Sequence, residues 1–224
     1  MDTIVIGASG GIGAALSRLY EERGDRVHRL SRSAGGMDLA DPASIAAAAD
    51  ALPFPGAERL VIATGLLHED GMSPERSLRD LDQQRLERAF QVNAIGPAMV
   101  LRHFVPRLAR SGRVEVAVLS ARVGSIADNR LGGWYGYRAS KAALNQLVRT
   151  AAIEVARSRP EAVLVALHPG TVDTAMSRPF QATVAQGRLF TPSRAAEALA
   201  GVLDRLTPAD SGGFFDWQSK AIPF

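Results

Sequence analysis

Short apolar runs alternate with longer amphipathic segments along almost the whole chain. The apolar runs predict buried strands at residues 3–6, 27–30, 59–62, 113–119, 162–167 and 212–216. Apolar positions at helical spacing predict helices that end near Gly24, extend over 81–110, end before Pro160, and begin at Pro192. This alternation of strand and helix predicts an α/β fold of three layers, a single-domain Rossmann fold with a mostly parallel central sheet.

Length and composition limit the class of protein. The 224 residues, 46% of them hydrophobic, are enough for one well-buried core, so we expect residues 1–224 to form a single domain. The chain has no cysteine, which excludes disulfides, zinc sites with Cys ligands and thiol catalysis. No apolar run reaches the roughly 18 residues typical of a membrane span, and no signal peptide is visible. We therefore expect a cytoplasmic protein with no membrane partner.

The charge pattern does not favour nucleic acid. The net charge is +3 and the isoelectric point about 9.8, but the arginines are interspersed with acidic residues and form no basic block. Solvated helix faces explain this pattern better, so no nucleic-acid partner is expected. The four histidines are scattered and lack the H-E-x-x-H spacing of a metal site, so no metal is expected either.

A glycine-rich turn follows the first predicted strand and precedes the first predicted helix. It reads Gly7-Ala8-Ser9-Gly10-Gly11-Ile12-Gly13. Glycines let the backbone turn tightly and approach a pyrophosphate, while the helix N-terminus supplies free N–H groups and a positive dipole. The turn therefore predicts a nucleotide-binding site near the N-terminus.

Tyr137 and Lys141 are four positions apart, so on a helix they lie on the same face. A free phenol titrates near pH ~10, and a neighbouring ammonium favours the phenolate and lowers this pKa. The pair could then transfer a proton at neutral pH. The plain alternative is a half-exposed tyrosine beside a solvated lysine, but Lys141 and Lys220 are the only lysines in an arginine-rich chain. A lysine kept at this position favours the functional interpretation.

The spacing Gly7-x-x-x-Gly11-x-Gly13, together with Tyr137-x-x-x-Lys141, resembles the short-chain dehydrogenase/reductase family, over almost the whole chain. The stretch Ser120 to Ile126, with the residues up to Trp134, is similar to the branch that contains sniffer-type carbonyl reductases and the bacterial C-factor signalling protein. The resemblance implies a Rossmann domain that binds a nicotinamide dinucleotide.

The resemblance also implies which residues bind the cofactor. Where NAD-dependent members carry an acidic residue after the second strand, this chain has Ser31 and Arg32, which would bind the 2′-phosphate of NADP(H) in preference to NAD(H). The cofactor positions at the phosphates are Gly7, Ser9, Gly11, Ile12 and Gly13, and Asp38 and Leu39 follow a third strand near adenine. Gly65 allows close approach of the cofactor, Lys141 would hold the nicotinamide ribose, and Tyr137 also contacts the cofactor. Pro169, Gly170, Val172 and Thr174 lie around the nicotinamide.

The catalytic positions implied by the family are Asn93, a serine, Tyr137 and Lys141. Asn93 lies inside the predicted helix 81–110, where it would kink the helix and support a proton relay, and Gly96 and Pro97 follow it closely. Ala121 occupies the usual serine position. Ser120 would face the other way on a regular strand, so a bend is needed to bring it inward. Ser120 is the first candidate for the substrate-orienting serine and Ser125 the second; the third possibility is that neither residue has this role.

These positions predict an NADPH-dependent carbonyl reductase or alcohol dehydrogenase that acts on a small-molecule carbonyl or alcohol. Residues 175–190 correspond to the variable substrate lid, and members of the family commonly form homodimers or homotetramers through the two long helices. Two alternatives remain. One is an NADP-binding signalling or sensor protein of C-factor type with little turnover, which Ala121 favours; the other is a structural α/β domain without affinity for NADP(H).

Overall fold

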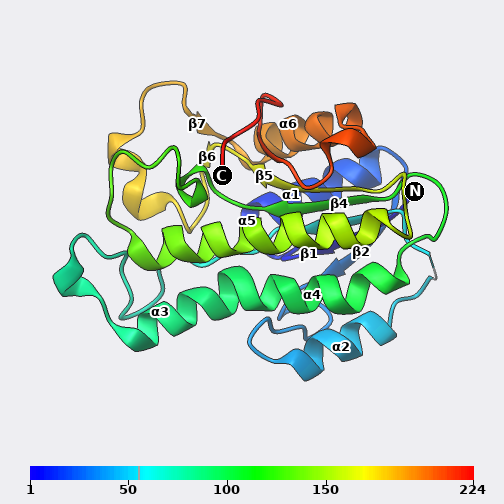
Figure 1. The fold of residues 1–224 in the computed structure, drawn as a ribbon, viewed down its shortest axis with the longest axis horizontal. Helices are drawn as coiled ribbons and strands as arrows, with labels where there is room; N and C mark the ends of the chain where they lie inside the picture. Colours follow the sequence, from blue (N-terminus) through cyan, green and yellow to red (C-terminus); the bar gives the residue numbers. More distant parts are fainter. Residues whose placement is uncertain (55) are drawn as a thin grey trace.

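A computed structural model describes residues 1–54 and 56–224 of the chain, which form a parallel six-stranded sheet between two layers of helices (Figure 1). The strand order is β2-β1-β3-β4-β5-β8, and each neighbouring pair is parallel. The strands are β1 (Asp2–Ile6), β2 (Arg26–Leu30), β3 (Arg59–Ile62), β4 (Glu115–Leu119), β5 (Val163–His168) and β8 (Phe214–Asp216). The predicted three-layer fold is confirmed.

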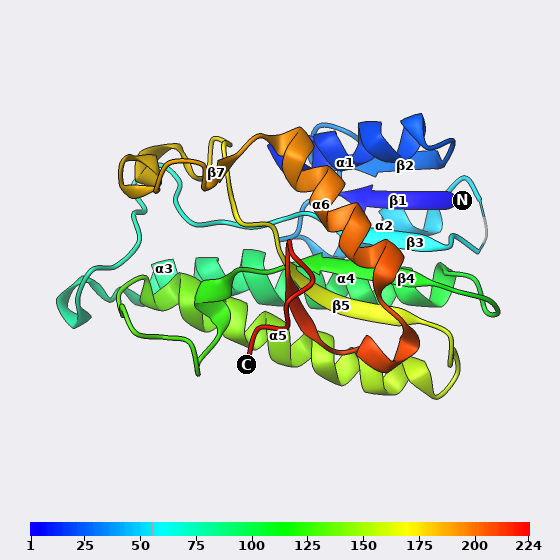
Figure 2. The same ribbon diagram turned by 90° about the horizontal axis from the view of Figure 1, so that it is seen from above.

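Helices cover both faces of the sheet. They are α1 (Gly11–Glu22), α2 (Pro42–Asp50), α3 (Gln83–Phe90), α4 (Gly96–Phe104), α5 (Tyr135–Ala156) and α6 (Pro192–Arg205). Figure 2 shows α1 and α6 on one side of the sheet and α4 and α5 on the other. Thr191 caps α6, since its side chain accepts a hydrogen bond from the Arg194 N–H. None of the described helices is both long and apolar enough to cross a lipid bilayer.

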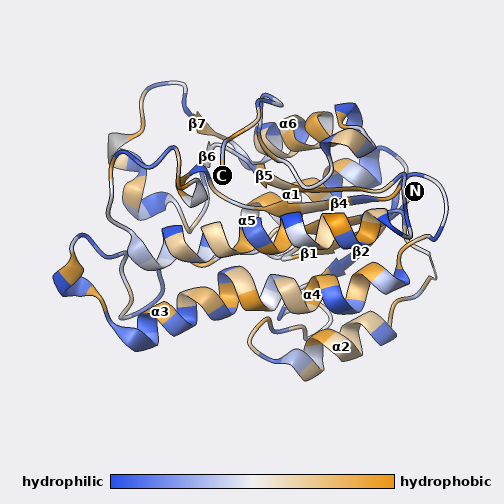
Figure 3. Cartoon of the chain, in the orientation of Figure 1, coloured by the Kyte–Doolittle hydropathy of each residue, from blue (hydrophilic) through white to orange (hydrophobic). Residues whose placement is uncertain are grey.

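The central strands β1, β3, β4 and β5 are mainly apolar and buried because both of their faces are covered, whereas the edge strand β2 carries Arg26, His28 and Arg29. Successive side chains of a strand point to opposite faces. In β1, Ile4 and Ile6 accordingly pack under α2, α4 and α5, whereas Val5 packs under α1 and α6. Figure 3 shows β1, β4 and β5 largely in hydrophobic colours and β2 in hydrophilic ones.

The helix predicted over residues 81–110 is interrupted. After α3 the chain forms a π-helical turn (η2, Gln91–Ile95), continues as α4, and ends in a short 3-10 turn (η3, Val105–Arg107). Pro97 in the first turn of α4 has no N–H to donate, and Gly96 lies tightly against Leu39. The expected break at Asn93 is therefore present, as a π-helical turn centred on this residue.

The strand expected before Asp38 does not form. Residues 31–36 make a turn instead, in which Ser31 and Ala34 exchange backbone hydrogen bonds and Gly35 and Gly36 adopt positive φ angles. A Ser-Gly-rich segment favours such a turn because glycine adopts these angles at no steric cost. Arg26–Leu30 consequently forms the edge of the sheet.

The predicted lid is bounded by a small two-stranded sheet. Its strands, β6 (Thr171–Val172) and β7 (Leu189–Phe190), pair in parallel, and a 3-10 helix (η5, Arg178–Thr183) lies between them. Figure 2 places this segment at the end of the sheet opposite the N-terminus, beyond the carboxyl ends of the strands. In a doubly wound sheet this end carries the ligand site.

Candidate active site

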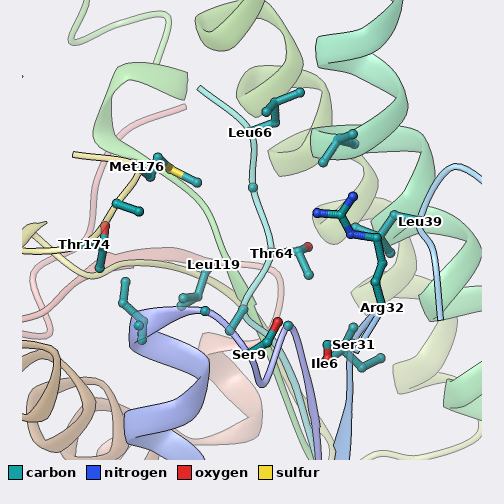
Figure 4. A pocket seen from close by; sticks show the side chains of 18 of the residues that line it. Ile6, Ser9, Ser31, Arg32, Leu39, Thr64, Leu66, Leu119, Thr174 and Met176 are labelled. Carbon is teal, nitrogen blue, oxygen red and sulfur yellow. The ribbon is translucent and has the colours of Figure 1, made fainter. Parts of the chain in front are cut away.

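A cleft of about 400 Å³ opens at the carboxyl ends of the parallel strands (Figure 4). It collects most of the residues that the sequence singled out, from segments far apart in the chain. Those lining it are Gly7, Ser9, Gly11, Ile12, Ser31, Arg32, Asp38, Leu39, Gly65, Ser120, Tyr137, Lys141, Pro169 and Thr174. The remaining four, Gly13, Asn93, Gly170 and Val172, lie behind the cleft wall.

The glycine turn is shaped by close backbone contacts. Gly7 has a φ of +84°, and a Cβ placed on it would lie 2.5 Å from the Ala63 carbonyl oxygen. A Cβ on Gly13 would lie 2.2 Å from the Gly7 carbonyl oxygen, and one on Gly11 would lie 2.8 Å from Thr174 Cγ2. Since α1 begins at Gly11 without a side-chain cap, its first N–H groups face the cleft. The turn is thus a cradle for an anion.

Tyr137 and Lys141 lie in the first two turns of α5 and line the same cleft as the glycine turn. The Lys141 ammonium nitrogen is 6.0 Å from the centre of the Tyr137 ring and donates a hydrogen bond to the Leu119 carbonyl oxygen at 2.9 Å. A Cβ placed on Gly65 would lie 3.5 Å from Lys141 Nζ, so the loop after β3 lies in van der Waals reach of the lysine. The helical spacing has therefore placed both groups at the wall of one cleft.

The expectation that Lys141 lowers the Tyr137 pKa is wrong for this structure. Burial raises the pKa of Tyr137 to about 12, and burial lowers the pKa of Lys141 to about 7. Removing a group from water penalises its charged form, so both groups are pushed towards neutrality. Lys141 is 2% exposed, and the hydrogen bond that its amine makes goes to an uncharged carbonyl.

Asn93 is fully buried behind the cleft. Its side-chain oxygen accepts a hydrogen bond from the Leu66 N–H at 2.7 Å, and its amide donates to the Leu66 carbonyl at 2.8 Å and to Ser140 Oγ at 3.1 Å. Ser140 Oγ in turn donates to the Tyr137 carbonyl at 3.0 Å. Asn93 therefore connects the loop after β3 with the helical turn that carries Tyr137.

The structure separates the two serine candidates. Ser120 lines the cleft and is 5% exposed, and its hydroxyl donates to Asn145 Oδ1 at 2.6 Å. Ser125 is also buried but lies away from the cleft, where its hydroxyl accepts a hydrogen bond from the Asp128 N–H. Since β4 ends at Leu119, Ser120 is released from the strict alternation of the strand.

The far end of the cleft carries the groups expected at the adenosine. Figure 4 shows the Arg32 guanidinium extended into the pocket beside Leu39. The Ser31 hydroxyl lies at the base of the turn and accepts the Ala34 N–H at 3.0 Å. Asp38 follows at the wall, where its carboxylate accepts the Ala40 N–H.

Further residues of the cleft have no signal in the sequence. Thr64 lines the wall, and its buried hydroxyl makes no hydrogen bond within the described residues. Glu69 and Arg88 form an ion pair at 2.9 Å across the rim. Leu66, from the loop after β3, also lines the wall. These four residues come together at the cleft only in the folded chain, so no local sequence motif indicates that they belong to the site.

The nicotinamide side of the cleft is bordered by the loop after β5 and by the lid. Pro169 and Thr174 line the wall, and Met176 extends over it from the lid (Figure 4). A ring nitrogen of His68 lies 3.1 Å from the Met176 carbonyl oxygen, so the loop after β3 contacts the lid. Gly170 and Val172 are in the same segment but face Phe190 and the protein interior.

An anion cradle, an unpartnered buried hydroxyl and a guanidinium in one elongated cleft fit a phosphate-bearing dinucleotide, and the described residues contain no cluster suited to a metal ion. The fold and the cleft define a doubly wound α/β protein with its ligand site at the carboxyl ends of the strands. A family model described as "Enoyl-(Acyl carrier protein) reductase" matches residues 7–202. The chain belongs to the short-chain dehydrogenase/reductase family of oxidoreductases, as its glycine and Tyr-Lys motifs predict.

Two curated relatives agree with this assignment, and a solved structure shares the fold. The chain is 39% identical over 149 residues to the "C-signal" of Myxococcus xanthus, covering 66% of this chain and 84% of the relative. It is 30% identical over 223 residues to the "1-hydroxy-2-glutathionyl-2-methyl-3-butene dehydrogenase" of Rhodococcus sp. (strain AD45), covering 94% of both. The fold is that of an NADPH-bound carbonyl reductase from chicken fatty liver, with a TM-score of 0.78, 23% identity and coverage of 100% and 98%.

Proposed function

We propose that this protein is an NADP(H)-dependent oxidoreductase that interconverts a carbonyl compound and the corresponding alcohol. The main support for this proposal is that Tyr137 and Lys141 line the same cleft as the glycine turn and Arg32. The Tyr137 phenol, the proposed proton donor, therefore lies in the same cavity as the glycine turn and Arg32, which are suited to bind a nucleotide. We propose that residues 1–224 act as a single cofactor-binding domain, with 175–190 as its substrate lid.

When bound, NADPH supplies a hydride to the carbonyl carbon. The N–H groups at the start of α1 would hold the pyrophosphate, and Arg32 with Ser31 would bind the 2′-phosphate, since a guanidinium pairs bidentately with such a group. Asp38 and Leu39 would border the adenine, and Pro169 and Thr174 the nicotinamide. The proposed preference for NADP(H) has two grounds. No carboxylate follows the second strand to repel a 2′-phosphate, and the Arg32 guanidinium is placed to bind one.

Tyr137 is the proposed general acid in reduction and the general base in oxidation. Its phenol would donate a proton to the carbonyl oxygen as the hydride arrives. Lys141 would hold the nicotinamide ribose, and a nearby anionic cofactor would favour its charged form. Ser120 would orient the carbonyl by turning its hydroxyl from Asn145. Asn93 would hold the Tyr137 turn in place and support the proton relay.

The test follows the loss of NADPH absorbance with a panel of aldehydes, diketones and quinones. Turnover of at least one compound, with NADH a poorer donor, is the expected result. Tyr137→Phe should retain NADPH binding, measured by fluorescence, and should lose nearly all turnover. Equal turnover by Tyr137→Phe and the unaltered chain would refute the assignment of the acid.

A second candidate function is a nucleotide-binding signalling protein with little turnover. It is favoured by the 39% identity to the C-signal of Myxococcus xanthus and by Ala121 at the usual serine position. This candidate predicts NADPH binding without oxidation of the cofactor by any compound in the panel. Absence of any NADP(H) affinity would exclude both candidates and leave a structural domain.

A further inference from the structure

A second cavity of about 400 Å³ lies behind the loop that follows β5. It shares no lining residue with the cofactor cleft, but the two are close neighbours: Pro169 lines the cleft, and the adjacent His168 and Gly170 line the second cavity. Its wall also includes Phe190 of β7 and Trp217, which meet edge to face with their ring centres 4.7 Å apart.

The cavity is positively charged. Arg122, Arg188 and Lys220 line it, and Asp216 is the one acidic residue among its described lining groups. Arg122 is paired with Asp216 and Asp128 at 3.1 Å each, so it is already neutralised. Arg188 and Lys220 form no ion pair within residues 1–54 and 56–224, although both face the same cavity. Two cations that approach one cavity without a carboxylate partner favour an anionic occupant.

A buried polar atom adds a separate observation. His168 ends β5 and lines the cavity, and its Nδ1 is buried without a hydrogen-bond partner in the described chain. Burial and the nearby Arg122 lower the pKa of His168 to about 4, so the ring is neutral at physiological pH. A neutral imidazole carries one N–H, which can be donated to an oxyanion.

The rigid part of the cavity is built around Asp216. Its carboxylate accepts the N–H groups of Gln218 and Lys220 and the guanidinium of Arg122. These contacts fix the loop that carries Trp217 and Lys220 against the sheet. Arg188, in contrast, is exposed and precedes β7 at the returning end of the lid. The cavity therefore lies between the sheet and the base of the lid.

We infer that this cavity is a second ligand site, for a small dianion such as a phosphate or a dicarboxylate, held by Arg188 and Lys220 with Arg122 and His168 at its floor. A bound oxyanion would bridge the base of the lid to the loop after β8. The site is independent of the proposed redox chemistry, because it requires neither the cofactor nor Tyr137.

Trp217 allows the site to be tested directly. In a Trp134→Phe background Trp217 is the remaining tryptophan, so its fluorescence reports on the second cavity. An Arg32→Gln substitution in the same background removes the guanidinium of the cofactor cleft, and Trp217 does not line that cleft, so phosphate at the glycine turn lies away from the reporter. We expect saturable fluorescence changes with inorganic phosphate and with succinate at constant ionic strength, and none with chloride.

The variants are Arg188→Gln and Lys220→Gln, with Arg178→Gln as the matched control because it removes the same charge from an exposed lid position outside the cavity. Each cavity variant should weaken phosphate binding by about tenfold or more, as expected when a charge-assisted hydrogen bond is lost. Arg178→Gln should bind like its parent. No saturable response, or equal binding by all three variants, would overturn the inference.

Amide hydrogen exchange of the unaltered chain provides a second measurement, without any substitution. Phosphate should slow exchange in residues 188–190 and 217–220 together. Exchange that is unchanged in both segments at saturating phosphate would also overturn the inference.

Discussion

Asn93 and Leu66 are joined by two hydrogen bonds that pair both polar atoms of the asparagine amide with both backbone groups of Leu66, at 2.7 and 2.8 Å. The pairing fastens the π-helical turn to the loop that lines the cleft after β3. A further bond to Ser140 extends the connection to the turn of α5 that carries Tyr137. One fully buried amide thus connects two segments that line the cleft.

Asn93→Ala should lower both stability and activity. The change leaves the Leu66 N–H and carbonyl without their partner, and a buried polar group left unpaired costs about 1–3 kcal/mol. We expect a free energy of unfolding lower by about 2 kcal/mol in urea titrations, and a lower kcat. Asn129→Ala is the control, since Asn129 is exposed and its side chain contacts the nearby Gly132 N–H. Equal stability of the two variants would contradict a stabilising role for the hydrogen bonds between Asn93 and Leu66.

Arg32→Ala should change the cofactor preference. The guanidinium reaches into the cleft, and a lost bidentate contact to a phosphate typically weakens binding by more than tenfold. NADPH affinity should therefore fall by about tenfold or more, with NADH affinity little changed. Arg29→Ala provides the comparison, because Arg29 is paired with Glu21 away from the cleft. A parallel loss of NADH affinity in Arg32→Ala would argue against a 2′-phosphate contact.

Lys141 should titrate near neutrality in the cofactor-free protein. Burial lowers its pKa from 10.5 to about 7. Protein labelled with ¹³C at lysine Cε has two lysine resonances, of which Lys220→Arg removes one. The remaining resonance should move with a midpoint near pH 7, and NADPH should shift this midpoint upward because the phosphates are negative. A midpoint that stays above pH 10 without cofactor would show that Lys141 is solvated.

The same shift predicts how stability varies with pH. Between about pH 7 and 10 the unfolded chain carries a proton on Lys141 that the folded chain has released, so this residue makes the folded state more stable as pH rises. Above pH 10 the opposite contribution of Tyr137, whose pKa burial raises to about 12, reduces stability. Lys141→Met should flatten the rise between pH 7 and 10 in urea titrations, and Lys220→Met should preserve it.

Arg59→Met should destabilise the sheet strongly. Arg59 is 5% exposed, pairs with Asp25 at 2.6 Å and Glu115 at 2.8 Å, and its guanidinium lies 4.2 Å from the centre of the Tyr20 ring. Removing the cation takes one partner from each of two largely buried carboxylates, which then keep as cationic partners the N-terminal ammonium (Asp25) and Arg113 (Glu115). We expect a cost near the lower end of the roughly 3–5 kcal/mol typical of a broken buried ion pair. The surface pair Arg107–Asp50 is the control, since Arg107→Met should cost less than about 1 kcal/mol. Urea midpoints that match between the two variants would exclude a structural role for the buried network.

We also predict self-association through the exposed face of α5. Leu147 and Ile153 are 37% and 52% exposed on this helix, where apolar side chains gain from being covered. Light scattering should give the mass of a dimer or tetramer, and Leu147→Glu should reduce it towards 23.8 kDa. Leu131→Glu is the control, because Leu131 is 92% exposed on a loop outside α5. A monomeric mass for the unaltered chain would refute the prediction.

Local patterns in the chain determine the layers of the fold, but not every element in them. The alternation of apolar runs and amphipathic segments predicted the layers of the fold, because burial on two faces requires continuous apolar strands. The break around Asn93 was also predictable, from an asparagine followed by Gly96 and Pro97. The strand expected before Asp38 was wrong because Ser31, Gly35 and Gly36 close a turn there.

Local pattern placed Tyr137 and Lys141 on one face but gave the wrong direction for the tyrosine pKa. The spacing alone shows that an ammonium is near a phenol, whereas the pKa depends on how completely both are removed from water. Thr64, Glu69 and Arg88 lacked any sequence signal, since their common cavity exists only after distant segments meet.

The sequence by itself determined the order of strands and helices, the glycine turn at the first helix, and the spacing of the Tyr-Lys pair, because these depend on neighbouring residues and on regular backbone geometry. Tertiary structure alone decided that Ser120 rather than Ser125 faces the cleft, that Lys141 and Tyr137 are driven towards neutrality, and that Arg188 and Lys220 line the same second cavity. Such properties depend on burial and on contacts between residues far apart in the chain, which a linear pattern does not contain.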